Sequence, residues 1–430
     1  MKTQIQTILF LTMLLSAAAV FGQHAEKNRL GVADRSELDS LRREGYEALY
    51  NLDYEGARRR FKEITQRFPD HPAGPQCMAA SLWLQQLNQS WELKASLYST
   101  ESYAGKNDRI DKRNMEEFRR WTRRAKLLAE ARLRQDPRDI DALYFLGATE
   151  GLNAAFAAGV ERRFMAAMRE GSRSVERHQE VLKIDPNFRD AELTIGLYNY
   201  IVGSLPLPVK VLAGSMGVRG SKKRGLEILE RVAREGRWAR DVARVLLIDL
   251  YKREKRWPEA VVISRELALK YPHNYIFKLQ LADALISQVA TKRRTKGAAI
   301  SIGSTGIAEE REAFSIFESL LHNRPMVEQA GTSSAVDLIH FRYGEALLVA
   351  EHPERAAEEF LAVATQVGAE PGLTTMGRLR AAQSMDLARR RREALVAYRT
   401  VLARPDVYHA HEEARRGLRE PYRKSSPVEK

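Results

Sequence analysis

A repeated spacing of small and aromatic residues constrains the fold of this chain more than any other feature of its sequence. Gly45, Ala57, Phe61 and Pro69 follow one another at offsets of 12, 4 and 8 residues. Small residues at such positions let two antiparallel helices approach, an aromatic ring fills the seam between them, and proline ends the second helix. The spacing therefore predicts a helical hairpin that closes at Pro69.

The same spacing recurs along the 430 residues of the chain. The small residue before the seam lies 11 or 12 residues ahead of a closing residue in three places, namely Ala260 with Pro272, Ala313 with Pro325, and Ala394 with Pro405 or Asp406. Gly344, Ala356 and Phe360 repeat the offsets of 12 and 4, and Phe317 and Tyr398 stand 4 residues after their alanines. This recurrence indicates a repeat architecture, in which each unit packs on its neighbours.

Three further units follow the same pattern with longer hairpins. Their anchor pairs are Gly147 with Ser174 before Pro186, Gly196 with Gly225, and Ala79 or Ala80 with Ala125 before Pro137. With the unit from Leu279 to Pro325 the chain holds about eight hairpins, and a polar helix around His411 to Leu418 would cover the apolar end of the stack. Because few segments alternate with a period of two, we predict an all-α fold, a right-handed superhelical solenoid of about eight helical hairpins with several enlarged insertions.

The pattern of Gly, Ala, aromatic and Pro resembles the tetratricopeptide repeat family across nearly the whole chain. This resemblance implies a TPR-like solenoid over residues 37–418, which acts as an interaction scaffold without a known catalytic site. A narrower resemblance covers Leu197 to Pro206 with Gly217, Gly220 and Gly225, and is similar to a segment of the tetratricopeptide repeat protein 39 group. Fungal relatives of that group are associated with the mitochondrial outer membrane and with clearance of inclusion bodies.

The first residues resemble an export signal, which departs from those intracellular relatives, so we do not carry their roles over. Lys2 precedes an apolar stretch from Ile8 to Leu15, and small residues follow for cleavage after Ala19 or Gly22. An uncleaved anchor is the alternative, but the apolar run is shorter than the roughly 18 residues of a membrane span. We expect a signal peptide at 1–22, a linker at 23–36, a disordered tail at 419–430, and a bacterial protein exported to the periplasm or the cell exterior.

Residues that could carry catalysis or bind a metal do not form a recognisable group. Cys77 is the one cysteine of the chain, and its apolar neighbours indicate a small core residue rather than a reactive thiol or an intermolecular bridge. His409 and Glu413 would share a helix face from which His411 is turned away, and two ligands do not make a metal site. No nucleophile turn occurs either. We therefore predict no enzyme activity, no cofactor and no metal.

The insertion at 201–223 has the most unusual composition. Its apolar part, Leu205 to Leu212, could dock on a membrane or on another protein, but we expect it to bury itself against the next repeat. The basic residues that follow begin a helix, whose free amides could help to hold an anion. The candidate residues for this contact are Ser221, Lys222, Lys223 and Arg224. Because the P-loop spacing is absent, we favour a structural role in which Ser221 caps the helix.

A net charge of +14 favours anionic partners. Trp121 lies among Arg119, Arg120, Arg123 and Arg124, a mixture typical of nucleic-acid binders. The stems of helical arginines more often cover apolar surface, and an export signal argues against a nucleic-acid partner. We therefore do not expect nucleic acid to bind.

The partner expected from the repeats is another protein or peptide, held in a concave groove that the first helices of the hairpins line. The candidate groove residues lie one turn before the small residue of the first helix or just after it, and on the equivalent face of the other first helices: Arg42, Tyr46, Asp249, Lys252, Glu345, Gln383 and Asp386. The alternative is a peripheral envelope protein that contacts anionic lipid through its basic face and the 201–223 insertion. Salt-sensitive binding to anionic vesicles would favour that alternative.

Overall fold

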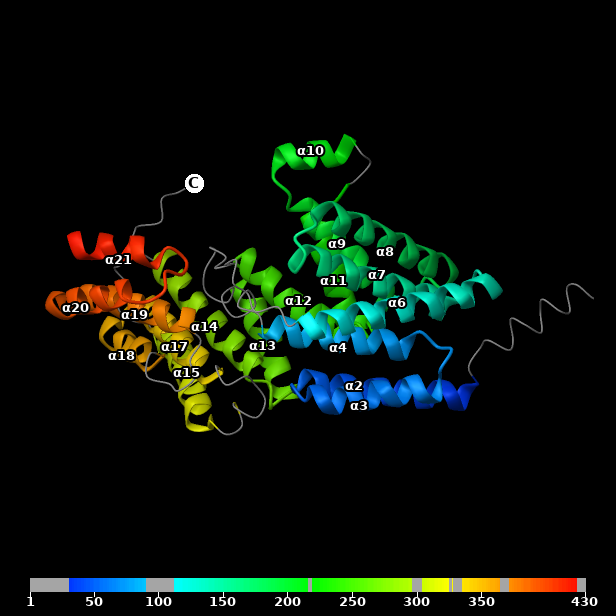
Figure 1. The fold of residues 1–430 in the computed structure, drawn as a ribbon, viewed down its shortest axis with the longest axis horizontal. Helices are drawn as coiled ribbons and strands as arrows, with labels where there is room; N and C mark the ends of the chain where they lie inside the picture. Colours follow the sequence, from blue (N-terminus) through cyan, green and yellow to red (C-terminus); the bar gives the residue numbers. More distant parts are fainter. Residues whose placement is uncertain are drawn as a thin grey trace, which may run out of the picture. The chain divides into compact units, whose positions relative to one another are not determined.

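The computed structural model describes residues 31–89, 112–215, 219–295, 304–324, 327, 335–363 and 371–423, and every regular element within these ranges is a helix (Figure 1). The predicted all-α fold is thereby confirmed. The expected signal peptide at 1–22 lies outside the described residues. The first described helix already begins at Val32, so part of the segment 23–36 is helical. None of the described helices is long and apolar enough to cross a membrane.

The chain divides into two compact units, which we describe separately. Unit 1 contains the described residues of 31–49, 54–85 and 112–243, and unit 2 contains residues 50–53, 86–89 and those from 244 onward. The helices that supply unit 1 are α2 (Val32–Tyr50), α3 (Tyr54–Arg67), α4 (Ala73–Gln89), α6 (Lys112–Gln135), α7 (Ile140–Gly159), α8 (Phe164–Ile184), η1 (Arg189–Ala191), α9 (Glu192–Gly203), α10 (Leu207–Ser215), α11 (Lys222–Glu235) and the start of α12 (Arg240–Arg253).

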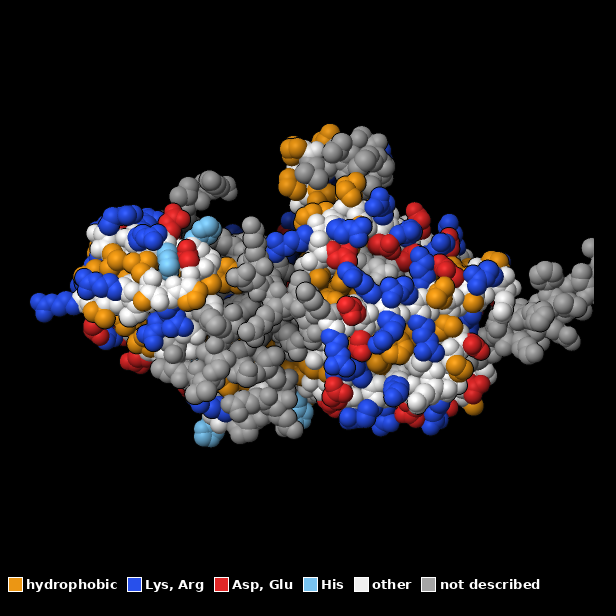
Figure 2. All heavy atoms as spheres, viewed as in Figure 1, with side chains coloured by type: hydrophobic (Ala, Val, Ile, Leu, Met, Phe, Trp, Pro, Cys, Tyr) orange, Lys and Arg blue, Asp and Glu red, His pale blue; other side chains and the backbone are white. Residues whose placement is uncertain are grey.

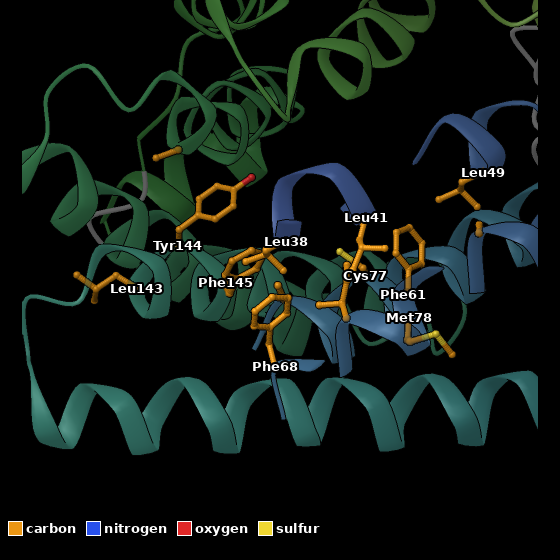
Figure 3. Close-up of a cluster of buried hydrophobic side chains, with 14 of the residues drawn as sticks. Leu38, Leu41, Leu49, Phe61, Phe68, Cys77, Met78, Leu143, Tyr144 and Phe145 are labelled. Carbon is orange, nitrogen blue, oxygen red and sulfur yellow. The ribbon is translucent and has the colours of Figure 1, made fainter. Parts of the chain in front are cut away.

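Close packing of α2 on α3 follows from the spacing that defines the first hairpin. Ala57 and Phe61 are completely buried. A Cβ atom on Gly45 would lie only 2.3 Å from Cε1 of Phe61, so glycine is what lets the ring lie against the first helix. Figure 3 shows Phe61 gathered with Leu41, Cys77 and Met78 in the core of unit 1. The predicted seam of this hairpin is confirmed.

Cys77 behaves as a core residue, as its neighbours indicated. Its side chain is fully buried, and burial raises the pKa of the thiol. A thiol that stays protonated is a poor nucleophile.

The stretched hairpins also form where the sequence predicted them. In the pair α7 and α8, Ser174 Oγ donates a hydrogen bond of 2.7 Å to the carbonyl oxygen of Gly147. In the pair α9 and α11, a Cβ atom on Gly225 would lie 2.8 Å from the carbonyl oxygen of Gly196. In the pair α4 and α6, Ala125 is completely buried. The extra length of the α9 and α11 unit is used by α10.

The apolar insertion does not bury itself as we expected. Leu207 is 74% exposed and Val211 is 65% exposed, both on α10. The prediction that this run packs against the next repeat is therefore wrong for these two side chains.

In unit 2, small residues of one helix again face an aromatic ring of a neighbouring helix. The helices of this unit are the remainder of α12, then α13 (Trp257–Lys270), α14 (Tyr275–Thr295), α15 (Ser304–His322), α17 (Ala335–Val349), α18 (Pro353–Val363), α19 (Pro371–Leu387), α20 (Arg391–Leu402) and α21 (Ala410–Arg419). A Cβ atom on Gly344 would lie 2.8 Å from the Phe360 ring, and one on Gly417 would lie 2.2 Å from Tyr398. The second contact places α21 on α20 as the predicted capping helix. The described helices thus pair into eight TPR-like hairpins followed by this cap.

The turns between α12 and α13, between α17 and α18 and between α19 and α20 share a left-handed residue that is not glycine. Lys255, Glu351 and Arg389 have φ values of 58°, 69° and 61°. After each of them the next N–H donates to a carbonyl five residues earlier, as from Arg390 to Met385 at 2.8 Å. This bond and its neighbour form a Schellman motif, which ends the first helix and starts the return of the chain.

Arg389→Gly is expected to stabilise unit 2 by about 0.5 kcal/mol. The left-handed conformation costs a side chain roughly 1–2 kcal/mol, and the flexibility of glycine in the unfolded chain takes back part of that gain. Urea unfolding followed by circular dichroism measures the change. Arg399→Gly, at an exposed position inside α20, is the matched control and should lose about 1 kcal/mol. Equal losses in both variants would contradict the assignment of strain to residue 389.

Candidate binding pocket

Unit 1 contains a cavity of about 290 Å³ whose walls come from several hairpins. The lining residues come from α2, from the turn before α4, from α7, from the segment around η1 and from the turn between α11 and α12: Arg35, Leu38, Asp39, Arg42, His71, Asp141, Tyr144, Phe145, Asp185, Asn187, Phe188, Arg189, Asp190, Glu235, Arg237 and Trp238. No Ser, Thr or Cys belongs to this lining. The walls are mainly aromatic and charged, and the hydroxyl that they contain is the phenol of Tyr144, whose pKa is raised by burial.

Arg42 is the most unusual residue of the pocket, because its charged side chain is only 5% exposed. Its guanidinium carbon lies 4.2 Å from the ring centroid of Trp238 and 4.9 Å from that of Phe145. Aromatic faces stabilise a cation in this position. Among the described residues Arg42 forms no ion pair, and its Nε has no acceptor. A buried cation therefore faces the cavity, and against the effect of burial the nearby carboxylate of Asp39 helps to raise its pKa, without forming an ion pair with it.

The other charged groups of the lining are already engaged. Asp39 pairs with Arg237 at 2.6 Å, Asp141 with Arg35 at 2.8 Å, and Glu235 with Arg189 at 3.0 Å. Asp185 accepts the backbone N–H of Asn187 at 2.9 Å. Oδ1 of Asp190 accepts three backbone N–H groups, from residues 237, 238 and 239, at 2.8, 3.0 and 2.9 Å, and so holds Trp238 beside Arg42. The lining thus holds five carboxylates and four guanidinium groups, and Arg42 is the guanidinium that no ion pair among the described residues engages.

His71 supplies a second buried donor. Its Nδ1 accepts the N–H of Ala73 at 3.2 Å, so the proton of the neutral ring sits on Nε2. Nε2 lies 3.9 Å from Oδ2 of Asp141, longer than a standard hydrogen bond, so the N–H of His71 attracts this carboxylate without a close contact. Burial lowers the pKa of His71, so the ring is neutral at pH 7. Burial alone would raise the pKa of Asp141, but the neighbouring His71 and Arg35 outweigh it and lower that pKa to about 2.

Of the groove residues predicted from the sequence, the structure places Arg42 in this pocket. Tyr46, one turn further along α2, is half-buried and meets the Phe61 ring edge-on at 5.3 Å. Sequence reasoning missed His71, Asp141 and Phe145, because these residues belong to other hairpins. Trp238 among basic residues was the one signal that could have pointed here.

The predicted groove residues of unit 2 are held by contacts within that unit. Lys252 on α12 pairs with the buried Asp283 and donates to Oε1 of Gln280 at 2.8 Å. Asp249 lies one turn before Lys252, and burial raises the pKa of its carboxyl. Lys252 thus interacts with side chains of α14 in the same unit.

Arg380 joins two further candidates in unit 2. It pairs with Glu345 at 2.5 Å and donates to Oε1 of Gln383 at 2.9 Å. The carboxyl of Asp386 is completely buried and accepts hydrogen bonds from Tyr398, Arg391 and the N–H of Tyr422. Asp386 therefore holds α19, α20 and the segment after α21 together.

The candidate anion contact at the start of α11 has a cap and exposed cations. Ser221 Oγ accepts the N–H of Arg224 at 3.4 Å, so its predicted capping role is confirmed. Lys222, Lys223 and Arg224 are exposed. In the part of the chain that the structure describes, no group of three His, Cys, Asp or Glu residues could hold a metal ion.

No protein-family model matches this sequence, and no curated protein matches it. Among solved structures, the chain is similar to the human IFIT1 dimer with m7Gppp-AAAA, at 12% identity and a TM-score of 0.42, over 89% of this chain and 85% of that chain. It is also similar to yeast Tom70, at 10% identity and a TM-score of 0.37, over 86% of each chain. Both are helical repeat proteins of the tetratricopeptide type. The fold itself is established by the helical hairpins described above.

Proposed function

We propose that this chain is a non-catalytic interaction scaffold of the bacterial cell envelope, which holds a segment of another protein in the pocket of unit 1. A carboxylate of that segment would pair with Arg42. The observation that carries the proposal is a buried guanidinium that lies near the rings of Trp238 and Phe145, forms no ion pair among the described residues and has no acceptor for its Nε. A buried charge costs free energy unless it is paired, and guanidinium and carboxylate form two parallel hydrogen bonds.

The size of the pocket favours one or two side chains over a whole metabolite. Its volume of about 290 Å³ lies at the lower limit for small-molecule sites. An acidic side chain or a terminal carboxylate would reach Arg42, and the rings of Tyr144 and Phe188 would contact a neighbouring apolar side chain. A polyphosphate would bring several negative charges close to Asp39 and Asp141, whereas an acidic side chain brings one. The lining therefore favours a peptide over a nucleic acid.

The localisation belongs to the same proposal and is supported by the sequence of residues 1–22 alone. A basic start followed by an apolar stretch and small residues is typical of export signals. The partner would then be an envelope or extracellular protein.

Selection from a displayed library of random peptides on the purified chain tests the pocket directly. We expect the enriched peptides to carry an acidic residue or to bind through their C-terminus. Arg42→Met should weaken their binding about tenfold to a hundredfold, since a hydrogen bond to a charged group contributes roughly 1.5–3 kcal/mol. Methionine keeps most of the length of the side chain and its apolar contacts, and circular dichroism checks that the variant folds.

Arg120→Met is the matched control, because Arg120 is exposed on α6 and outside the pocket. It should leave peptide affinity unchanged. Peptides that bind Arg42→Met as tightly as the parent chain would overturn the proposal. So would displacement of the peptides by a single-stranded RNA oligonucleotide that itself needs Arg42.

A further inference from the structure

The helix α10 projects from the rest of unit 1 with apolar side chains exposed. No other described helix packs along it, and Figure 1 shows it standing apart from α9 and α11. Leu207 and Val211 lie four residues apart, on one face of α10, and are 74% and 65% exposed. Ile201, in the last turn of α9, adds a third apolar side chain that is 52% exposed. Figure 2 shows hydrophobic side chains gathered at this projection.

Below α10, the end of α9 and the start of α11 come close together and form a neck. A Cβ atom on Gly203 would lie 2.4 Å from the backbone nitrogen of Lys222, and one on Gly220 would lie 2.7 Å from the carbonyl oxygen of Asn199. The end of α9 and the start of α11 can approach this closely because both glycines lack a side chain. Lys210 Nζ adds a hydrogen bond of 3.3 Å to the carbonyl oxygen of Gly203. The chain therefore leaves and re-enters unit 1 at one point, and α10 stands on that neck.

The charged residues of the segment that forms the projection have one sign. No acidic residue occurs between Glu192 and Glu227. The basic residues of that stretch are Lys210, Arg219, Lys222, Lys223 and Arg224. Lys222, Lys223 and Arg224 are exposed at the start of α11, at the base of the neck. An apolar tip thus rises from a cationic base.

We propose that the projection formed by residues 201–215 and 219–224 docks on an anionic lipid bilayer. In this arrangement Leu207 and Val211 enter the boundary between headgroups and acyl chains, while the cations of α11 contact anionic headgroups. A helix of nine residues is about 14 Å long, too short to cross a hydrocarbon core of about 30 Å. Apolar area and basic residues together set the strength of such interfacial binding. A convex tip with charges of one sign fits a deformable anionic surface without a preformed groove.

Co-sedimentation of the full chain with lipid vesicles tests the proposal. We expect binding to vesicles of phosphatidylcholine with phosphatidylglycerol, and at least about tenfold weaker binding to phosphatidylcholine alone or in high salt. The double variant Leu207→Ser with Val211→Ser should bind anionic vesicles at least about tenfold more weakly. Both side chains are exposed, so folding should be unaffected, which circular dichroism checks.

The matched control is Val262→Ser with Leu269→Ser on α13, whose side chains are 53% and 76% exposed. This variant should bind like the parent chain. A fluorophore on Val211→Cys should report a less polar environment when anionic vesicles are added, since Cys77 is buried and should stay unlabelled.

Three outcomes would overturn the proposal. The first is absence of binding to anionic vesicles by the parent chain. The second is equal loss of binding in the α10 variant and in the α13 control. The third is a change of oligomeric state on substitution of Leu207 and Val211 without lipid, because the tip would then be an interface between copies of the chain.

Discussion

Asp386→Ala should destabilise unit 2 by about 3 kcal/mol, because removing a buried carboxylate leaves its hydrogen-bond donors without an acceptor. Its carboxyl accepts the hydroxyl of Tyr398 at 2.9 Å, the guanidinium of Arg391 at 3.0 Å and the N–H of Tyr422 at 2.8 Å. Burial and the charge of Asp386 together raise the pKa of Tyr398, so the phenol stays a donor. Alanine leaves these three donors without an acceptor, which costs roughly 1–3 kcal/mol for each fully buried group.

Asp386→Asn is the control that separates the charge from the hydrogen bonds. Its amide oxygen can still accept from the Tyr398 hydroxyl, so we expect about half the loss seen with alanine. Urea unfolding gives the free energies, and hydrogen exchange in α20 and α21 shows where the stability is lost. If alanine and asparagine cost the same, or neither costs anything, the carboxyl does not hold these helices together.

Gly45→Ala should destabilise unit 1 by about 2 kcal/mol, although alanine is the better helix former. The new methyl group would lie 2.3, 2.8 and 2.9 Å from three atoms of the Phe61 ring. Phe61 is completely buried and has no room to withdraw. Overpacking of this kind costs about 3 kcal/mol at the upper end, of which the helix propensity of alanine returns about 1 kcal/mol. Thermal and urea unfolding measure the difference.

Two companion variants make this test specific. Gly214→Ala, on α10, meets nothing within 4 Å and should be neutral or slightly stabilising. Phe61→Leu should cost less in the Gly45→Ala background than in the parent chain, since the smaller side chain relieves the clash. Additive losses in the double variant would show that residues 45 and 61 do not share one seam.

The contacts between the two helices of a hairpin could be predicted because the residues that make them are close in the sequence. The offset from Gly45 to Phe61 spans a single hairpin, and a small residue opposite a ring has few other ways to pack. The same reasoning found the pairs Gly147 with Ser174 and Gly196 with Gly225, although their hairpins are longer. Helical periodicity and proline endings then gave the fold class and the capping helix α21.

The pocket could not be predicted in the same way. Asp39 and Arg237, which pair across it, are 198 residues apart. Arg42 was a candidate from its position on the first helix. Its neighbours Trp238 and Phe145 are far from it in sequence, and tertiary packing decides where they lie against α2. Asp386 occupies the corresponding type of position in unit 2, yet its carboxyl is buried and holds helices together.

The sequence by itself thus determined which residues pair within each hairpin, because a fixed offset along one chain decides that contact. Only the tertiary structure decided which charges remain without a partner and which apolar side chains remain exposed. Leu207 and Val211 show the reason most clearly. Their composition suits a core, but the contact between Gly203 and the start of α11 fixes a neck that carries α10 away from any helix it could pack against.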